Sequence, residues 1–257
     1  MTTTAISLKN LHLKLGGKTI LDDVSVDFHA SELTILLGPN GTGKSSLLKL
    51  ITKEWPLKGK VSYFDIDSDS WKASTLARHM GVLPQSSTLS FNFSVKEVIE
   101  LGGLTLRASQ KEIASIAEQY MRETDVLHLA DRLYPSLSGG EKQRVHLARV
   151  LTQLAQSQDK KVLLLDEPTS ALDLSHQHKT LQLAKSLTDE GASVITVIHD
   201  LNLAAQYADR VLILNEGKLV ADGTPWETLT KENIADVYHW PIQVVPHPER
   251  GHPIILT

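Results

Sequence analysis

Residues 33–46 read LTILLGPNGTGKSS, and this stretch sets the fold class of the chain. Its first five residues form a nearly continuous apolar run, which is typical of a strand buried on both faces of a parallel sheet. A glycine-rich loop follows at once, and beyond it Leu47, Leu48, Leu50 and Ile51 recur with the spacing of one helical face. The order strand, loop, helix predicts the opening of a parallel α/β layer.

The loop at residues 38–45 fits the phosphate-binding pattern called the P-loop. Its glycines let backbone amides converge on phosphate oxygens, Lys44 reaches the outer phosphates, and the Ser45 hydroxyl is suited to ligate Mg²⁺. An ordinary glycine-rich turn is the alternative, and the position between a buried strand and a helix argues against it. The residues predicted to bind nucleotide here are Gly38, Pro39, Asn40, Gly41, Thr42, Gly43, Lys44, Ser45 and Ser46.

A second apolar strand, residues 162–165, ends in Asp166 and Glu167. Ligands of open parallel sheets lie at the carboxyl ends of the strands, so both carboxylates are expected at the same edge as the P-loop. Asp166 can then hold the Mg²⁺ shell and Glu167 can polarise the attacking water, because phosphoryl transfer needs positioning and charge neutralisation more than covalent help. A helix cap after the strand is the alternative interpretation of these two acids.

A helix is predicted to begin after Ser138-Gly139-Gly140-Glu141. Ser138 and Glu141 have the spacing of a capping box, which explains these two residues structurally. The capping box does not explain the glycine pair, which lets a phosphate approach the helix amides. One triphosphate does not need two sites in one chain. We therefore expect this second anion site to serve a neighbouring copy of the chain.

The remaining patterns complete the expected architecture. Apolar and polar residues alternate around the turn Gly16-Gly17, which predicts short antiparallel strands at the N-terminus. We expect one α/β domain over residues 1–257, with a P-loop core around a parallel sheet. An inserted helical subdomain is expected over about residues 91–150, and a C-terminal β tail over about residues 242–257.

The composition of the chain limits the kinds of partner and site that we expect. The net charge of −4 and the scattered Lys and Arg residues do not suggest a nucleic-acid partner. The chain has no cysteine, which excludes a disulfide framework and a thiolate metal site. It shows neither a signal peptide nor an apolar run of the roughly 20 residues that span a bilayer. We expect a soluble chain whose membrane role, if it has one, comes from docking onto another protein.

The ordered set of motifs resembles the ABC transporter ATPases over nearly the whole chain. It comprises the P-loop, Gln85, Ser138-Gly139-Gly140, the acidic strand end, Asp173 and His199. The resemblance implies binding of ATP with Mg²⁺, with Ser45, Gln85 and Asp166 around the metal. It also implies that Glu167 and His199 are catalytic, that His199 contacts the γ-phosphate, and that Asp173 links two sites. The serine-glycine motif would complete the nucleotide site of a second copy, in a head-to-tail dimer.

The resemblance extends to the iron-chelate, haem and cobalamin importers, in the segments from Asp222 and from His247 to the C-terminus. It implies polytopic permease subunits, a periplasmic substrate-binding protein as an indirect partner, and a peripheral position on the cytoplasmic face of a bacterial inner membrane. The family stacks adenine on an aromatic residue, but none stands near Leu15, where we align it. The cargo does not follow from the residues. We interpret His247 and His252 as surface residues beside proline and not as haem ligands.

Other functional classes are less compatible with the sequence. Chromosome-associated ATPases of this type place long coiled coils between the P-loop and Ser138, and no sustained heptad pattern occurs there. Translation factors of this type carry two such domains in one chain. A P-loop kinase has no need of the glycine pair that follows Ser138.

Overall fold

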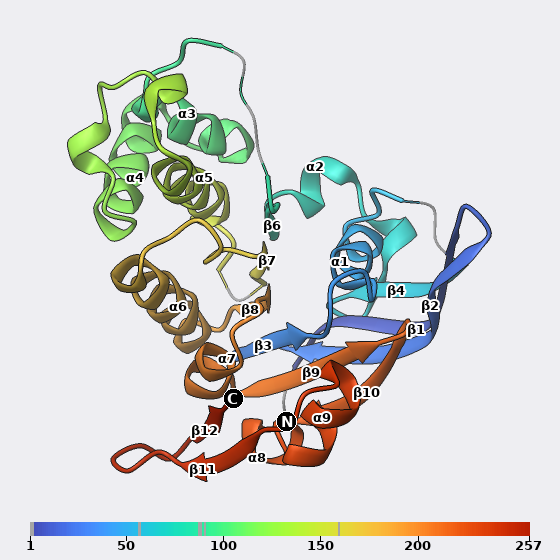
Figure 1. Cartoon of the computed structure of the whole chain (residues 1–257). Coiled ribbons are helices and arrows are strands. Elements are labelled where there is room, and N and C mark those ends of the chain that lie inside the picture. Colours follow the sequence, from blue (N-terminus) through green and yellow to red (C-terminus); the bar gives the residue numbers. More distant parts are fainter. Residues whose placement is uncertain (1–2, 56–57, 87–88, 90, 159) are drawn as a thin grey trace.

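The computed structural model describes residues 3–55, 58–86, 89, 91–158 and 160–257. A six-stranded sheet with the order β10-β9-β3-β8-β7-β6 forms its centre (Figure 1). The neighbours from β9 to β6 pair in parallel, and β10 pairs with β9 antiparallel. The strands are β3 (Glu32–Leu37), β6 (Met80–Leu83), β7 (Val162–Asp166), β8 (Ser193–Val197), β9 (Arg210–Asn215) and β10 (Lys218–Gly223).

The central strand β3 is buried on both faces, as its apolar run predicts. Leu33, Ile35 and Leu37 belong to one hydrophobic cluster, and Leu36 belongs to the cluster on the opposite face. Four helices contribute side chains to the first cluster: α5 (Gly139–Leu154), α6 (Leu174–Asp189), α7 (Leu201–Tyr207) and α9 (Lys231–Tyr238). The second cluster contains α1 (Lys44–Ile51) and the N-terminal sheet. The sheet is therefore the middle layer of the molecule.

The N-terminal sheet has the order β2-β1-β4-β5. Its strands are β1 (Thr4–Leu15), β2 (Lys18–His29), β4 (Lys58–Tyr63) and β5 (Ile66–Asp67). The expectation of short strands is wrong, because β1 and β2 are each 12 residues long. Asn10, with φ 52°, and Asp23, with φ 57°, lie where the pairing register shifts, so bulges interrupt the alternation without ending the strands. Gly16 and Gly17 both have positive φ, as a tight two-residue hairpin requires.

Short helices between β6 and β7 pack on α5 (Figure 1). They are α3 (Val95–Glu100), η2 (Leu101–Thr105), α4 (Gln110–Glu123), η3 (Leu127–Leu129) and η4 (Tyr134–Ser136). A separate hydrophobic cluster joins α3, α4 and α5. Capping boxes at Ser94, Ser109 and Ser138 begin α3, α4 and α5, and each contributes about 1 kcal/mol to its helix.

The chain ends in elements that close one side of the sheet. They are α8 (Pro225–Thr228), α9 (Lys231–Tyr238), β11 (Gln243–Pro246) and β12 (Pro253–Leu256). Two further short helices, η1 (Ser68–Ser70) and α2 (Ala73–Leu76), lie between β5 and β6. β11 and β12 form a two-stranded sheet of their own. It is attached to α7 through Asn202, whose side chain exchanges two hydrogen bonds with the backbone of Ile255, at 2.8 and 3.0 Å.

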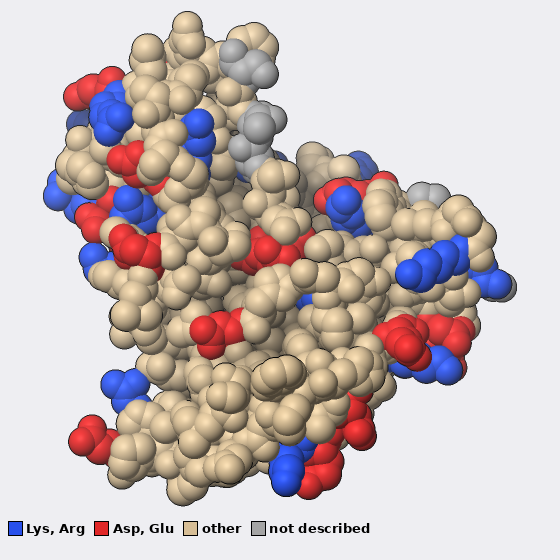
Figure 2. Space-filling model, in the orientation of Figure 1, with Lys and Arg blue, Asp and Glu red and all other residues tan. Residues whose placement is uncertain are grey.

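The expected fold class, a P-loop core with a parallel sheet and an antiparallel N-terminal sheet, is confirmed. On the face drawn in Figure 2, acidic and basic side chains lie interspersed, and the outline is notched between the α3–α5 region and the part that carries α1 and α2. Across the described ranges, we find no helix whose length and apolar character would let it cross a membrane.

Candidate functional site

The loop between β3 and α1 has a backbone shape that requires glycine. Gly38 has φ +142°, and a Cβ there would lie 2.0 Å from the carbonyl oxygen of Leu214. Gly43 has φ +105°, and a Cβ there would lie 2.9 Å from the carbonyl oxygen of Ile20. Gly43 is also the N-cap of α1, and no side chain caps this helix. The first amides of α1 are therefore left for an anion, together with the positive end of the helix dipole.

Lys44 is held under this loop. Its Nζ donates to the carbonyl oxygens of Gly38, at 2.7 Å, and Pro39, at 2.9 Å, and the residue is only 6% exposed. Burial lowers the pKa of Lys44, while the negative charges of Glu167 and Asp166 act to raise it. The ammonium group is thus tethered by backbone oxygens close to two carboxylates, and a phosphate group would offer it stronger, charged acceptors.

Asp166, the last residue of β7, meets Ser45 from α1 at the floor of the site. The Ser45 Oγ donates to Asp166 Oδ1 at 3.2 Å. Burial raises the pKa of Asp166, and the hydrogen bond from Ser45 acts in the opposite direction. A hydroxyl and one carboxylate are hard oxygen donors, and Mg²⁺ in nucleotide sites is commonly held by one or two carboxylates with phosphate and water oxygens. These two residues therefore fit Mg²⁺.

Glu167 and His199 face each other across the ends of β7 and β8. His199 Nε2 lies 2.8 Å from Glu167 Oε1. Glu167 has a left-handed φ of 52°, and its carbonyl oxygen accepts hydrogen bonds from Gln143 and Ser170. The Glu167 side chain points toward the P-loop: Glu167 and His199 line one cavity together with Lys44. A carboxylate held in this way can accept a proton from a bound water.

An open cavity of about 600 Å³ joins the P-loop, Gln85, Glu167 and His199. Six of the nine predicted P-loop residues line it directly, and so does Gln85. They are Asn40, Gly41, Gly43, Lys44, Ser45, Ser46 and Gln85. Asp166 does not line the cavity but accepts a hydrogen bond from Ser45, which does. Gly38, Pro39 and Thr42 belong to the loop without lining the cavity, and Thr42 donates to the Pro39 carbonyl oxygen at 2.9 Å.

The other predicted residues lie around a different cavity of about 390 Å³. Ser138, Gly139, Gly140 and Asp173 line this cavity, and no P-loop residue does. Gly140 has a packing reason, because a Cβ there would lie 2.8 Å from the carbonyl oxygen of Ala171. Gly139 has only a side-chain carbon at 3.9 Å as a neighbour. The argument that the glycine pair serves an anion therefore depends on Gly139 alone.

Two residues that touch the nucleotide cavity or its loop, Tyr238 and Ile20, were not predicted from the sequence. Tyr238 at the end of α9 accepts a hydrogen bond from the Gly38 amide at 3.0 Å, across a separation of 200 residues. Ile20 in β2 lines the cavity, whereas Leu15, the position considered for an aromatic, is absent from the lining. The alternating pattern of β2 predicted that Ile20 is in a strand, but a strand pattern does not show which loop the strand passes.

Known proteins show the class to which this site belongs. The family model for ABC transporters matches residues 21–170, more than half of the chain. The chain belongs to the ABC transporter ATP-binding family, and its enzymatic activity is ATP hydrolysis coupled to transport.

Individual relatives match almost end to end. The chain is 56% identical to the hemin import ATP-binding protein HmuV of Photobacterium damsela subsp. piscicida, covering 98% of this chain and 96% of that protein. It is 52% identical to the protein of the same name from Vibrio cholerae, covering 99% of both. Among solved structures, a protein described as a metal-chelate type ABC transporter in an inward-facing conformation has a TM-score of 0.80 at 27% identity, over 99% of this chain and 98% of that chain. The cbiO1 protein of Clostridium perfringens has a TM-score of 0.77 at 25% identity, over 91% and 94%.

Removing the Tyr238 hydroxyl is expected to weaken ATP binding more than catalysis. In Tyr238→Phe the Gly38 amide loses its acceptor, and a buried unpaired amide costs about 1–3 kcal/mol. We expect the KM for ATP to rise about tenfold, with kcat within about twofold of the wild type. The matched control is Tyr207→Phe, which removes a hydroxyl bonded to His178 away from the loop. An unchanged KM in Tyr238→Phe would show that Tyr238 does not set the shape of the loop.

Proposed function

We propose that this chain binds and hydrolyses ATP with Mg²⁺ to drive a bacterial inner-membrane importer of haemin. The observation that carries the proposal is the single cavity that joins Lys44, Ser45, Glu167 and His199 in a chain more than half identical to hemin import ATP-binding proteins. Ferric siderophores and cobalamin are the alternative cargoes.

The residues in and beside the cavity have different roles in ATP hydrolysis. The first amides of α1 and Lys44 hold the outer phosphates, and Ser45, Asp166 and Gln85 would hold Mg²⁺, which neutralises charge on the β- and γ-phosphates. Glu167 orients the attacking water and accepts its proton. His199 lies against Glu167 in the same cavity and would contact the γ-phosphate.

A second copy of the chain would complete the site. The motif Ser138-Gly139-Gly140 and Asp173 lie on a cavity of their own, separate from the P-loop of the same chain. In a head-to-tail pair, each motif meets the P-loop of the other copy, which gives two shared ATP sites. The free amides and helix dipole at the start of α5 then face the γ-phosphate.

The permease contact is proposed on the segment that leads from Gln85 into α3. The Phe91 side chain is 69% exposed there, and its ring lies 6.0 Å from that of Phe93. Phe93 and Leu89 are partly buried against the cluster of α3, α4 and α5, so only part of this segment offers an apolar surface. Residues 87, 88 and 90 of the expected contact lie outside the described part of the chain. This docking would place the subunit on the cytoplasmic face of the membrane.

Haemin itself is proposed to stay away from this subunit, delivered by a periplasmic binding protein and passed by the permease. His247 and His252 have local structural roles. His247 Nδ1 accepts from the amides of Glu249 and Arg250, both at 3.1 Å, and His252 Nδ1 lies 3.0 Å from the carbonyl oxygen of Pro253. The two histidines thus shape the turn between β11 and β12.

Reconstitution tests the proposal. The chain is purified with the permease encoded beside it, placed in liposomes with the periplasmic binding protein, and given haemin, a ferric siderophore or cobalamin in parallel. We expect ATP-dependent uptake of haemin. Uptake of one of the other two instead would reassign the cargo, and the absence of ATP-dependent uptake of all three would contradict the proposal.

A further inference from the structure

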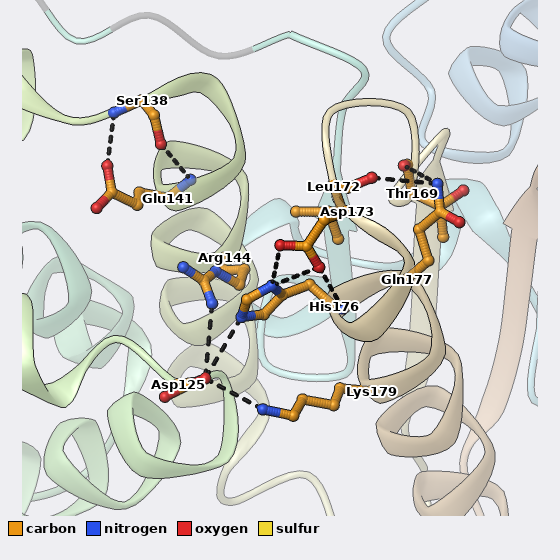
Figure 3. Close-up of polar contacts among 10 residues, drawn as sticks. All are labelled: Asp125, Ser138, Glu141, Arg144, Thr169, Leu172, Asp173, His176, Gln177 and Lys179. Carbon is orange, nitrogen blue, oxygen red and sulfur yellow. Dashed lines mark hydrogen bonds and ion pairs between the residues drawn. The ribbon is translucent and has the colours of Figure 1, made fainter.

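A histidine on α6 holds the carboxylate that caps the same helix (Figure 3). Asp173 precedes α6, and its Oδ1 accepts from the backbone amide of His176 at 2.9 Å. The ring of His176 contacts the same carboxylate: His176 Nδ1 lies 2.9 Å from Asp173 Oδ1 and 3.0 Å from Asp173 Oδ2. An ordinary N-cap carboxylate needs only the amide, so the ring contact fixes the Asp173 side chain beyond what capping requires.

The other ring nitrogen reaches a different part of the chain. His176 Nε2 lies 3.3 Å from Asp125 Oδ2, in the loop that follows α4. The same oxygen accepts from Lys179 on α6 at 3.2 Å and lies 3.8 Å from Arg144 on α5. Asp125 is therefore a junction between the start of α6, the middle of α5 and the end of α4 (Figure 3).

The ring of His176 lies between two carboxylates. Both of its ring nitrogens face carboxylate oxygens, which only accept hydrogen bonds. The hydrogen bonds from His176 hold the pKa of Asp173 below its usual range, and those from Lys179 and then His176 do the same for Asp125. The cluster is thus a bridge in which the ring of His176 joins the carboxylates of Asp173 and Asp125.

The bridge lies at the cavity that would receive the nucleotide of a second copy. His176 and Asp173 line it together with Ser138, Gly139 and Gly140. The neighbouring Gln177 holds the backbone of the same loop, by donating to the carbonyl oxygens of Thr169 and Leu172, both at 3.2 Å. The first turn of α6 therefore fixes both the side chain and the backbone of the loop that ends at Asp173.

We propose that His176 is a positioning residue for ATP hydrolysis: by bridging Asp173 to Asp125, it sets the Asp173 carboxylate relative to the start of α5 in the shared site. This inference rests on the proposed shared site. His176 does not line the cavity of its own P-loop. Its loss is therefore expected to affect the closed, hydrolysing pair more than the binding of ATP.

The test uses the assembled transporter and separates kcat from KM. We expect His176→Ala to lower kcat about tenfold and to leave the KM for ATP within about twofold of the wild type. His176→Asn keeps a donor near the position of Nδ1 and should restore kcat to within about threefold. In a double-mutant cycle, His176→Ala combined with Asp173→Ala should be no slower than Asp173→Ala alone, because both act through one carboxylate.

The matched control is Lys179→Ala, which removes an exposed ion pair to Asp125 and leaves the histidine bridge in place. Its kcat should stay near the wild-type value, since exposed pairs contribute little. Equal losses in Lys179→Ala and His176→Ala, an unchanged kcat in His176→Ala, or losses that multiply in the double mutant would each overturn the inference. Hydrolysis by Lys44→Ala in the same preparation would instead overturn the proposed function, and this inference with it.

Discussion

Glu167→Gln is expected to bind ATP with at least wild-type affinity and to hydrolyse it about 10²–10⁴ times more slowly. Glutamine keeps the size of the side chain, and its carbonyl oxygen can still accept from His199, which lies 2.8 Å from the Glu167 carboxylate. It cannot take a proton from water. Because the amide carries no charge, repulsion of the triphosphate also falls, so the ATP-bound pair of subunits should accumulate.

Two measurements on the assembled complex check this result. Single-turnover hydrolysis reports the chemical step, and sedimentation with Mg-ATP reports the closed pair. Glu190→Gln is the matched control, since it removes the same charge from a residue that pairs with Lys161 outside the nucleotide cavity. A wild-type rate of hydrolysis in Glu167→Gln would show that this carboxylate is not the catalytic base.

Lys44→Ala is expected to abolish measurable ATP hydrolysis and to weaken ATP binding about 10- to 100-fold. The size follows from about 1.5–3 kcal/mol for hydrogen bonds to a charged group, at about 1.4 kcal/mol for each factor of ten. The Nζ of Lys44 already lies between the carbonyl oxygens of Gly38 and Pro39, so the ammonium is positioned before the nucleotide arrives. Little of its interaction energy is then spent on ordering the side chain.

Calorimetry gives the affinity, and phosphate release gives the rate. Lys44→Met tests whether the charge matters rather than the volume, because it keeps the length of the side chain and should be equally inactive. Lys49→Ala is the matched control: Lys49 belongs to the same helix, but its Nζ lies 4.8 Å over the ring of Trp55. Near-normal turnover in Lys44→Ala would remove the P-loop assignment.

Local sequence patterns were sufficient for the parts of the site that follow strands. Asp166 ends a buried apolar strand, and the P-loop, Glu167 and His199 lie just beyond the ends of such strands, while parallel strands bring their carboxyl ends to one edge. The capping serines were also predictable, because a capping box is contained within four residues. These features need no knowledge of distant contacts.

The parts that could not be predicted depend on long-range packing. Tyr238 and Gly38 are 200 residues apart, and a lone tyrosine in a helical pattern gives no sign of its partner. Gly140 was read as an anion contact, although the nearby Ala171 carbonyl explains why it lacks a side chain. The length of β1 was also missed, because the bulge at Asn10 breaks the alternation without breaking the strand.

The place of β3 in the sheet has a consequence for synthesis of the chain on the ribosome. β3 and its P-loop emerge before the strands that β3 pairs with, β8 and β9, which begin at Ser193 and Arg210. Until both have emerged, the apolar segment Glu32–Leu37 has unpaired backbone groups on both edges and is prone to aggregate. Tyr238 comes later still, so a nascent chain acquires its finished ATP-binding loop only after α9 has emerged. Chains that terminate before β8 should therefore be bound by chaperones or degraded by proteases, and they should have no ATPase activity.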